Sequence, residues 1–361
     1  MESLGRFPDP FLEEIAAQPA AIRRAAGALR AQIDPLERLA RIVADPARPR
    51  RSAVFTGMGA SYAACYAPVT VLAGLGVQAS MVDAAELLHF RRGLLSRDTV
   101  VVIVSQSGRS AEAVRLVAEL DSSAGPTVVA VTNGPDNPLA LSAKVALDTH
   151  AGAEVGPSTL SFGASVVVLA AVADVLAGRP VSSALTTAEA NAGAAACSAE
   201  GLLDEPAASA DRFRAWFDDR PAVVLLGRGA ARAASEVGAL VLKEAARVPA
   251  EALESAQFRH GPLELAGRDL AAAVVAIEPA TEDLDRALAA ELAAAGGSVL
   301  VIGRTATGEA GEREVMIGQV DRALAPSVAV VPFQLLAWRV AVDRGFSPGM
   351  LQIASKVTTR E

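Results

Sequence analysis

The chain has 361 residues, 52% of them hydrophobic, and a formal net charge of −8 at pH 7. This length exceeds the size at which one hydrophobic core stops growing, so we expect two domains, and the hydrophobic fraction excludes a disordered protein. A protein with this negative net charge has no overall positive potential that would attract nucleic acid. An anionic ligand must therefore be bound by hydrogen-bond donors at a local site.

Membrane and secreted classes are also unexpected. The longest apolar segment that we identify, Ser165 to Gly178, is too short to span a bilayer and contains Asp174. Residues 1–10 lack the pattern of a signal peptide. Cys65 and Cys197 are too few for a metal cluster and are typical of a reduced cytosolic protein. We therefore expect a cytoplasmic protein that binds neither membrane nor nucleic acid.

The chain begins with a helical pattern and then alternates strands and helices. Residues 1–35 are expected to form a helical lead-in, because FLEEIAAQPAAI is amphipathic. The first domain is expected over 36–180. Its segment AVFTGMGAS, Ala53 to Ser61, predicts a strand followed by a glycine turn, and a helical pattern follows at 60–72.

The most informative segment is TVVVIVSQSGRS, Thr99 to Ser110. Its β-branched apolar run predicts a strand buried on both faces of a parallel sheet, and AEAVRLVAEL after it predicts a helix. The polar turn between them lies at a helix N-terminus, where backbone N–H groups attract anions. A single serine there would be interpreted as a helix cap. Several hydroxyls beside a glycine favour a phosphate ligand instead: Ser105, Gln106, Ser107, Gly108 and Ser110.

An internal repeat follows. Ala53 to Ser61 recurs as Val223 to Ala231, an offset of 170 residues (223 minus 53). The same offset places 99–104 over 270–274 and 126–133 over 296–303. Because helical patterns lie between these strands, the sequence predicts two copies of a doubly wound parallel α/β domain.

The second domain is expected over 200–345, after a polar, alanine-rich and partly helical linker at 178–205. Residues 346–361 are expected to form an irregular tail. The offset places Val275 to Glu278 on Ser105 to Gly108, so the second copy has lost the hydroxyls and gained an acid. We therefore expect one phosphate site per chain.

Several motifs together resemble the sugar isomerase (SIS) family. They are the glycine turn, SQSG at 105–108, AGAEVG at 151–156, LGRG at 226–229, FRHGP at 258–262 and KVT at 356–358. LGRG or AGAEVG alone would be a weak signal, whereas SQSG, FRHGP and KVT in this order and spacing are specific. The resemblance covers the chain from about residue 20 and implies two tandem SIS domains, each a doubly wound parallel five-stranded sheet flanked by helices.

The resemblance also implies the roles of individual residues. The chemistry that it implies requires neither a metal nor a cofactor. Glu244 resembles the base that moves a proton between C1 and C2 of an open-chain sugar. His260 resembles the residue that helps to open the ring, reaching in some relatives into a neighbouring subunit, so a homodimer with shared sites is expected. Lys356 resembles the tail lysine near the sugar carbonyl. The implied substrate-binding residues are Gly59, Ser61, Ser105, Gln106, Ser107, Ser110, Glu154 and Ser158.

Four departures from the family pattern bear on these roles. Relatives have a lysine where this chain has Val241, a threonine at Ala60, and an acid at Arg109. The closing motif is KVT, which leaves the register of Lys356 open. The printed sequence also has no N-terminal nucleophilic cysteine before the repeat, so we expect no glutaminase domain.

Two interpretations of function remain. In the first, the chain is a phosphosugar isomerase or deaminase that acts on an amino-sugar or ketose phosphate through an enediol or enolamine intermediate. In the second, it is a non-catalytic phosphosugar-binding regulator, as the loss of the lysine at Val241 suggests. Retention of Glu244 and His260 together favours the enzyme, because a binder needs neither proton-transfer group. Without the resemblance, Glu244 would be interpreted as a solvated helix residue and Lys356 as a surface lysine.

Overall fold

The computed structural model describes residues 9–46, 52–120, 125–305 and 313–360. The expectations for residues 1–8 lie outside these ranges. The chain forms two compact units that interleave along the sequence. The first-sheet unit comprises Ala20–Gly152, Ser161–Gly193 and Val357–Glu361, and the second-sheet unit comprises Met1–Pro19, Ala153–Leu160 and Ala194–Lys356.

The first-sheet unit contains a five-stranded parallel sheet in the order β2-β1-β3-β4-β5. The central strand β3 is buried along its whole length, which confirms the strand expected at 99–104. Its Val100 lies in register with Ala53 on one side and Thr127 on the other. The strands are β1 (Ser52–Thr56), β2 (Ala79–Met81), β3 (Thr99–Val104), β4 (Thr127–Thr132) and β5 (Val145–Asp148).

Helices surround this sheet, and two of them differ from expectation. The helix expected at 60–72 is interrupted at Ala64 and Cys65, and the linker expected to be partly helical is a continuous 22-residue helix, α9, because it is rich in alanine. The helices that wholly or partly belong to this unit are α1 (Pro10–Ala28), α2 (Ile33–Ala44), α3 (Gly59–Ala63), α4 (Tyr66–Gly74), α5 (Ala84–His89), α6 (Ala111–Leu120), α7 (Pro138–Ser142), α8 (Leu160–Leu176) and α9 (Val181–Leu202).

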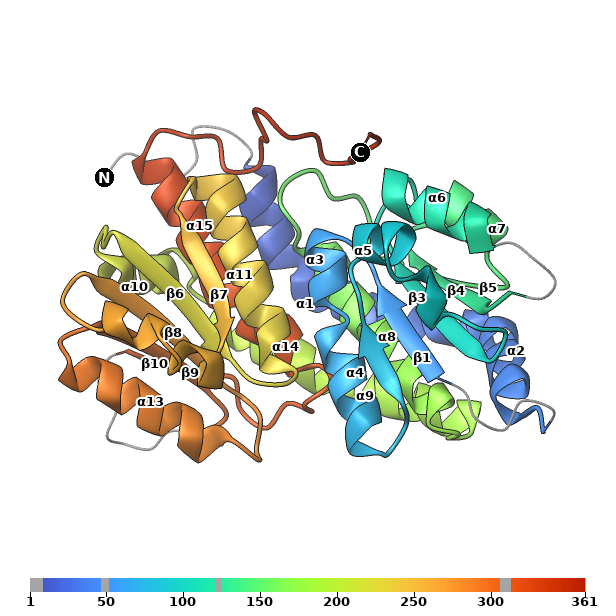
Figure 1. Ribbon diagram of the computed structural model, residues 1–361. Coiled ribbons are helices and arrows are strands. Elements are labelled where there is room, and N and C mark those ends of the chain that lie inside the picture. The colour runs from blue at the N-terminus through green and yellow to red at the C-terminus, as the bar shows by residue number, and fades with distance from the viewer. Residues whose placement is uncertain (1–8, 47–51, 121–124, 306–312, 361) are drawn as a thin grey trace. The chain divides into compact units, whose positions relative to one another are not determined.

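The second-sheet unit repeats the same topology, with strand order β10-β9-β8-β6-β7. Its sheet lies between α13 on one side and α11 on the other (Figure 1). The strands are β6 (Ala222–Gly227), β7 (Ala250–Glu254), β8 (Leu270–Ala276), β9 (Ser298–Gly303) and β10 (Glu314–Met316). The helices are α10 (Pro206–Phe217), α11 (Ala231–Ala246), α12 (Ser255–Phe258), α13 (Glu282–Ala294), α14 (Ala325–Ala329) and α15 (Val331–Asp343).

The internal repeat is confirmed by the strand positions. Each of β6 to β10 begins within a residue or so of the position 170 residues after its counterpart in β1 to β5. Both sheets reverse strand order between their first and third strands, so each has one switch point at its carboxyl edge, where ligands bind in such folds. The expectation of two doubly wound parallel sheets flanked by helices is therefore confirmed.

The expectation that Ser165 to Gly178 is the longest apolar segment is wrong. Residues Ala325–Asp343, which span α14 and α15, are long and apolar enough to cross a membrane, and 89% of the apolar window is buried inside the protein. Ser165 to Gly178 is therefore not the longest such segment. Because α15 packs against α10 and α11, its apolar composition is that of a core helix.

Packing around α15 generates a stability prediction. Gly238 on α11 has no space for a side chain, since an added Cβ would lie 2.4 Å from Phe333 and 2.6 Å from Leu225. We expect Gly238→Ala to destabilise the protein by about 1–3 kcal/mol through overpacking. The matched control is Gly193→Ala in α9, where an added Cβ meets nothing within 4 Å. It should stabilise the protein by about 0.5–1 kcal/mol.

Urea unfolding followed by circular dichroism measures both changes. Equal stability of Gly238→Ala and the unmodified chain would contradict the close approach of α11, α15 and β6.

Candidate functional site

The turn after β3 places hydroxyl groups together as the sequence predicts. The hydroxyls of Ser105 and Ser110 lie 2.7 Å apart, although five residues separate them. Ser107 Oγ accepts a hydrogen bond of 3.1 Å from the backbone N–H of Arg109, which leaves its own proton available for donation. Ser105 is buried, and Gln106 and Ser107 are partly exposed. The turn thus presents donors at the N-terminus of α6.

Gly108 makes this turn possible. Its φ is +59°, and an added Cβ would lie 1.8 Å from Oδ1 of Asn137. Asn137 is itself buried and fixed, because it caps α7 at Ala140 N–H and donates to the carbonyl of Gly134. The close packing therefore requires glycine on both conformational and steric grounds.

Two further groups border the turn. Arg109 is exposed, and its guanidinium donates to the carbonyl of Asp136 at 3.0 Å. The backbone N–H of Ala111, at the start of α6, donates to the carbonyl of Thr358 in the tail at 3.1 Å. The KVT segment therefore contributes to the surroundings of the polar turn.

The first glycine turn lies at the end of the neighbouring strand β1. Gly59 has a φ of +54° and begins the short helix α3, and the N–H of Ser61 donates to the carbonyl of Met58. Because β1 and β3 are adjacent and parallel, this turn and the serine turn follow the same edge of the sheet.

In the second-sheet unit, Glu244 and Lys356 belong to one charged cluster. Glu244 lies in the last turns of α11 and is half-buried. Burial raises the pKa of its carboxyl and the nearby charge of Glu154 adds to this, whereas the positive charges of Lys356 and Lys243 act in the opposite direction. Glu244 is therefore a desolvated carboxylate beside a cation, rather than a solvated surface group.

Lys356 is held by the AGAEVG segment. Its Nζ donates to Glu154 Oε2 at 2.6 Å and to the carbonyl of Gly156 at 2.7 Å. The side chain of Glu154 has no exposed surface, and its Oε1 accepts from the N–H of Thr159 at 2.8 Å. A buried carboxylate needs such partners, so Glu154 fixes the position of the tail lysine.

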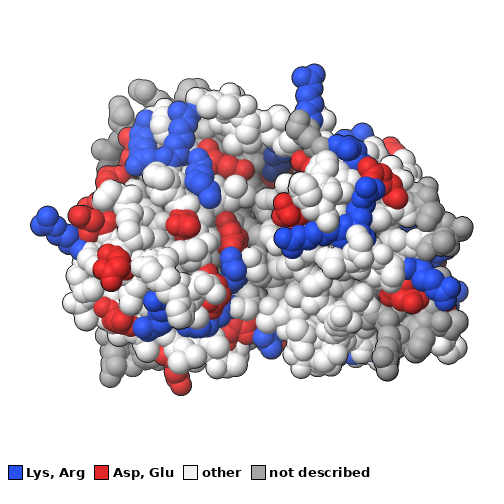
Figure 2. All heavy atoms as spheres, viewed as in Figure 1, with Lys and Arg blue, Asp and Glu red and all other residues white. Residues whose placement is uncertain are grey.

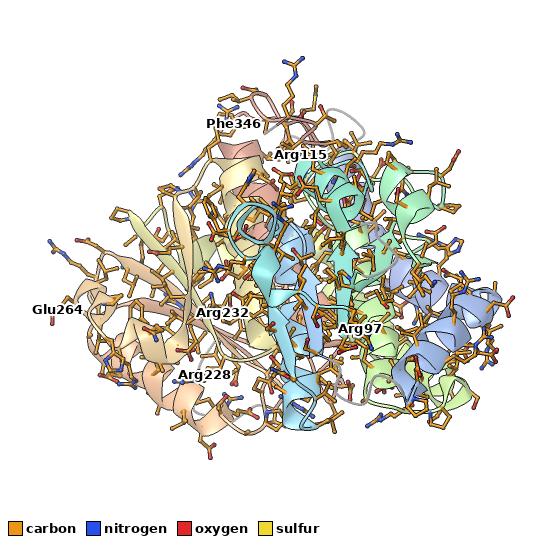
Figure 3. The ribbon with its side chains drawn as sticks, turned by 45° about the vertical axis from the view of Figure 1, so that its right-hand side comes forward. Arg97, Arg115, Arg228, Arg232, Glu264 and Phe346 are labelled. Atoms are coloured by element: carbon orange, nitrogen blue, oxygen red, sulfur yellow. The ribbon has the colours of Figure 1, made fainter. Side chains whose placement is uncertain are left out.

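Ser158 lies next to Thr159, and His260 lies in a separate loop. The carbonyl of Ser158 accepts a hydrogen bond from the side chain of Gln334 on α15. His260 is exposed in the loop after α12, and its N–H donates to the carbonyl of Gln257. Figure 3 shows Glu264, in the same loop region, pointing outward. Within the described ranges, no hydrogen bond or ion pair joins His260 to Glu244 or Lys356.

In the second copy, a carboxylate occupies the position equivalent to the serine turn. Glu278 is 4% exposed, and its Oε1 accepts from the N–H of Ala230 in the LGRG turn at 2.8 Å. Its Oε2 pairs with Arg322 at 2.8 Å. The repeat offset relates Glu278 to Gly108 and Ala230 to Ala60. The acid expected here therefore fills the turn with the chain's own negative charge.

The rest of that turn is also internally neutralised. Arg228, labelled in Figure 3, donates to Asp285 at 2.9 Å and to Glu254 at 3.3 Å.

On the face drawn in Figure 2, basic side chains are interspersed with acidic ones. Among the described residues, no three His, Cys, Asp or Glu side chains are placed to hold a metal ion.

Sequence reasoning missed Glu14 and Thr159. Glu14 is buried on α1, and its Oε1 accepts from the N–H of Val155 at 2.5 Å. Thr159 follows the AGAEVG segment and contacts both Glu14 and Glu154. The signal was present, because Glu14 lies three residues after Phe11 and so on the apolar face of its helix.

Comparisons with known proteins agree with this architecture. Glutamine–fructose-6-phosphate aminotransferase [isomerizing] of Pyrobaculum aerophilum is 29% identical over 365 residues, covering 100% of this chain and 59% of that protein. The protein of that name from Thermococcus kodakarensis is 30% identical over 363 residues, covering 98% of this chain and 58% of that protein. The chain therefore spans less than two thirds of the length of these curated relatives.

Solved structures share the fold. The C-terminal domain of glucosamine-fructose-6-phosphate aminotransferase from Francisella tularensis has a TM-score of 0.81 at 23% identity, covering 96% of this chain and 98% of that chain. Tagatose-6-phosphate ketose/aldose isomerase from Escherichia coli has a TM-score of 0.77 at 19% identity, covering 97% and 96%. Glucosamine-6-phosphate deaminase from Thermotoga maritima has a TM-score of 0.72 at 19% identity, covering 96% and 99%.

The family comparison covers both sheets. The model of the SIS domain matches residues 48–174, which contain β1 to β5, and residues 217–344, which contain β6 to β10. The chain belongs to the SIS domain family and contains two SIS segments.

Proposed function

We propose that this chain is a phosphosugar isomerase or deaminase that moves a proton between C1 and C2 of an open-chain sugar phosphate. The proposal rests on the cluster of Glu244, Lys356 and Glu154 in the second-sheet unit. It is supported by the similarity to an isomerizing aminotransferase and, at the level of the fold, to a ketose/aldose isomerase and a deaminase.

Glu244 is proposed as the base. A carboxylate with a raised pKa is a stronger base than an ordinary surface glutamate, and it is still ionised near neutral pH if the pKa remains below that pH. It would take the proton from C2 of an aldose, giving an enediol, and return it to C1, giving the ketose. Because only the ionised form accepts a proton, turnover should rise with pH through the pKa of Glu244.

Lys356 is proposed to act at the carbonyl. When C2 loses its proton, negative charge develops on the carbonyl oxygen, and an ammonium group placed in advance stabilises that charge. Glu154 and the Gly156 carbonyl hold Nζ with two hydrogen bonds, so little reorganisation is needed. His260 is proposed to trade the ring-opening proton, and its exposed loop is compatible with the homodimer that the resemblance implies.

Three outcomes share this chemistry. With a ketose or aldose phosphate, proton return gives isomerisation alone. With a 2-amino sugar phosphate, the enolamine is protonated at C1 to an imine at C2, and addition of water releases ammonia and the ketose. With a fructosamine-type phosphate, whose amine is on C1, the proton leaves C1 and returns to C2, and water adds to the resulting imine at C1, which releases the amine and the aldose phosphate.

Phosphate recognition is assigned to the serine turn, one site per chain. Ser105, Ser107 and Ser110 supply hydroxyl donors at the N-terminus of α6, where the helix dipole favours a dianion. Glu278 supports a single phosphate site per chain, because its carboxylate occupies the corresponding turn of the second copy.

The alternative is a phosphosugar-binding regulator without turnover. Val241 favours it, since this fully buried residue on α11 stands where relatives have a lysine.

The deciding experiment uses hexosamine, ketose and fructosamine-type phosphates in deuterated water and follows exchange of the C1 and C2 protons and release of amine. Exchange supports the enzyme, and binding without exchange supports the regulator. The cytoplasmic location remains a proposal, and neither Cys65 nor Cys197 forms a disulfide.

The serine turn generates a binding prediction. The double variant Ser105→Ala, Ser107→Ala removes two donors, and we expect its affinity for a bound phosphosugar to fall at least 100-fold, since each hydrogen bond to a charged group contributes about 1.5–3 kcal/mol. Calorimetry measures the affinity. Ser96→Ala, in the loop before β3, is the control. Unchanged affinity of the double variant would reject the turn as the phosphate site.

The base generates a separate prediction. Glu244→Gln keeps the shape of the side chain but cannot accept the C2 proton. We expect phosphosugar affinity within about threefold of the unmodified chain and a loss of exchange of at least 1000-fold. Nuclear magnetic resonance in deuterated water measures exchange. Glu236→Gln on the same helix is the control, and residual exchange in Glu244→Gln at the original rate would exclude Glu244.

The filled turn of the second copy generates a stability prediction. Glu278→Ala removes the anion that faces Ala230 N–H and Arg322, and we expect a loss of about 1–3 kcal/mol in chloride buffer. Sulfate should restore part of this loss by occupying the vacated position. Thermal unfolding at increasing sulfate compares the variant with the unmodified chain. An equal response of both proteins to sulfate would contradict the assignment.

A further inference from the structure

The charged cluster of the second-sheet unit contains one acid that the proposed chemistry does not use. Glu14 on α1 is 7% exposed and lies among the groups that include Glu154 and Lys356. The hydrogen bonds around Glu14 indicate whether its carboxyl group is protonated.

Thr159 lies between two carboxyl groups. Its Oγ1 is 3.3 Å from Glu14 Oε2 and 3.2 Å from Glu154 Oε1, and the residue has no exposed surface. A hydroxyl has one proton, so if both groups were ionised the two contacts would have to share it as a weak three-centre hydrogen bond between two buried negative charges. A proton on one of the two carboxyl groups, donated to Thr159, makes both contacts full hydrogen bonds.

The hydrogen-bond donors around each carboxyl group indicate which of the two carries the proton. Both oxygens of Glu154 already accept hydrogen bonds, Oε1 from Thr159 N–H at 2.8 Å and Oε2 from Lys356 at 2.6 Å, so this group suits the ionised form. Glu14 Oε1 accepts from Val155 N–H at 2.5 Å and lies 3.5 Å from Gly156 N–H. Within the described part of the chain, the one hydrogen-bond partner of Glu14 Oε2 is Thr159.

We propose that Glu14 is protonated at neutral pH and, through Thr159, positions the Glu154–Lys356 pair. The chain of donors runs from Glu14 Oε2–H to Thr159 Oγ1 and from Thr159 Oγ1–H to Glu154 Oε1. Lys356 donates to the other oxygen of Glu154. Glu14 is a positioning residue in this scheme, and its effect on turnover rests on the proposed function of Lys356 and Glu244.

The surrounding charges agree with a neutral Glu14. Burial raises the pKa of Glu14 and so does the charge of Glu154, against the backbone donors Val155 and Gly156 and the charge of Lys356. α11 contributes Glu244 and Lys243 to the same cluster. α15 contributes the neutral Gln334, which bonds with Gln18 of α1.

Ionisation of Glu14 would change the charge of the whole cluster. With Glu14 neutral, the carboxylates of Glu154 and Glu244 balance the ammonium groups of Lys356 and Lys243. Ionisation of Glu14 would add an uncompensated negative charge beside Glu154. The neutral acid thus holds Glu154 in place without drawing Lys356 away from it.

The first experiment needs no substrate. Glu14→Gln mimics the protonated acid, because its amide N–H can donate to Thr159 and its oxygen can accept from Val155 N–H. A group with a raised pKa in the folded state stabilises the fold below its unfolded pKa of about 4.5, and this contribution is lost as pH rises through the folded pKa. Glutamine does not titrate, so thermal unfolding is compared for both proteins between pH 4.5 and 9.

We expect Glu14→Gln to gain on the unmodified chain as pH rises, by about 2–4 °C for each unit of the raised pKa. A difference that does not change with pH, or that favours the unmodified chain as pH rises, would show an ionised Glu14 and overturn the proposal. The control is Glu13→Gln, because Glu13 is an exposed neighbour on α1 and should show no such trend.

The second experiment measures turnover with the phosphosugar that undergoes C2 proton exchange. At pH 7 we expect Glu14→Gln to exchange at least tenfold faster than Glu14→Ala. At alkaline pH it should keep its rate while the unmodified chain declines. If Glu14→Gln is as impaired as Glu14→Ala, the carboxylate itself is required and the proposal is wrong.

The two experiments separate the possible failures. If the unmodified chain exchanges no proton with any phosphosugar, the proposed function fails, and the unfolding series still decides the protonation of Glu14. If exchange occurs but the unfolding series shows no pH trend, only the assignment of Glu14 fails.

Discussion

The arrangement of the second-sheet unit depends on the burial of one carboxylate. The side chain of Glu154 has no exposed surface, so it must be compensated by hydrogen bonds and by a positive charge. Thr159 provides the hydrogen bonds and Lys356 the charge, and the latter fixes a segment close to the C-terminus. This pair gives Glu244 a fixed electrostatic environment, in which burial and Glu154 raise its pKa and Lys356 opposes them.

The two SIS segments show how one topology can carry different sites. Both sheets have the same strand order, and in both a glycine turn follows the first strand. In the first, Gly108 and the serines leave donors facing the turn. In the second, Glu278 supplies an anion from the chain itself and Arg322 pairs with it. The difference resides in side chains at the strand ends and not in the backbone that positions them.

Departures from the family pattern have different structural contexts. Val241 is part of the core between α11 and its neighbours, so a charged residue there would have to be compensated. Arg109 is exposed and uses part of its guanidinium to bind the carbonyl of Asp136. The first changes the interior beneath the proposed base, and the second adds a cation at the edge of the serine turn.

The sequence alone determined the two parallel sheets and the serine turn, because strand periodicity, turn chemistry and a repeat at one offset can be recognised along the chain. Glu244, His260 and Lys356 became candidate residues only through the resemblance to the SIS family. The sequence did not reveal that Glu14 and Thr159 join Glu154, since residues 14, 154 and 356 are brought together only by packing. Only the tertiary structure could show which donors face each carboxyl oxygen, because these contacts join segments that are distant in the sequence, and the number of donors influences where a proton lies.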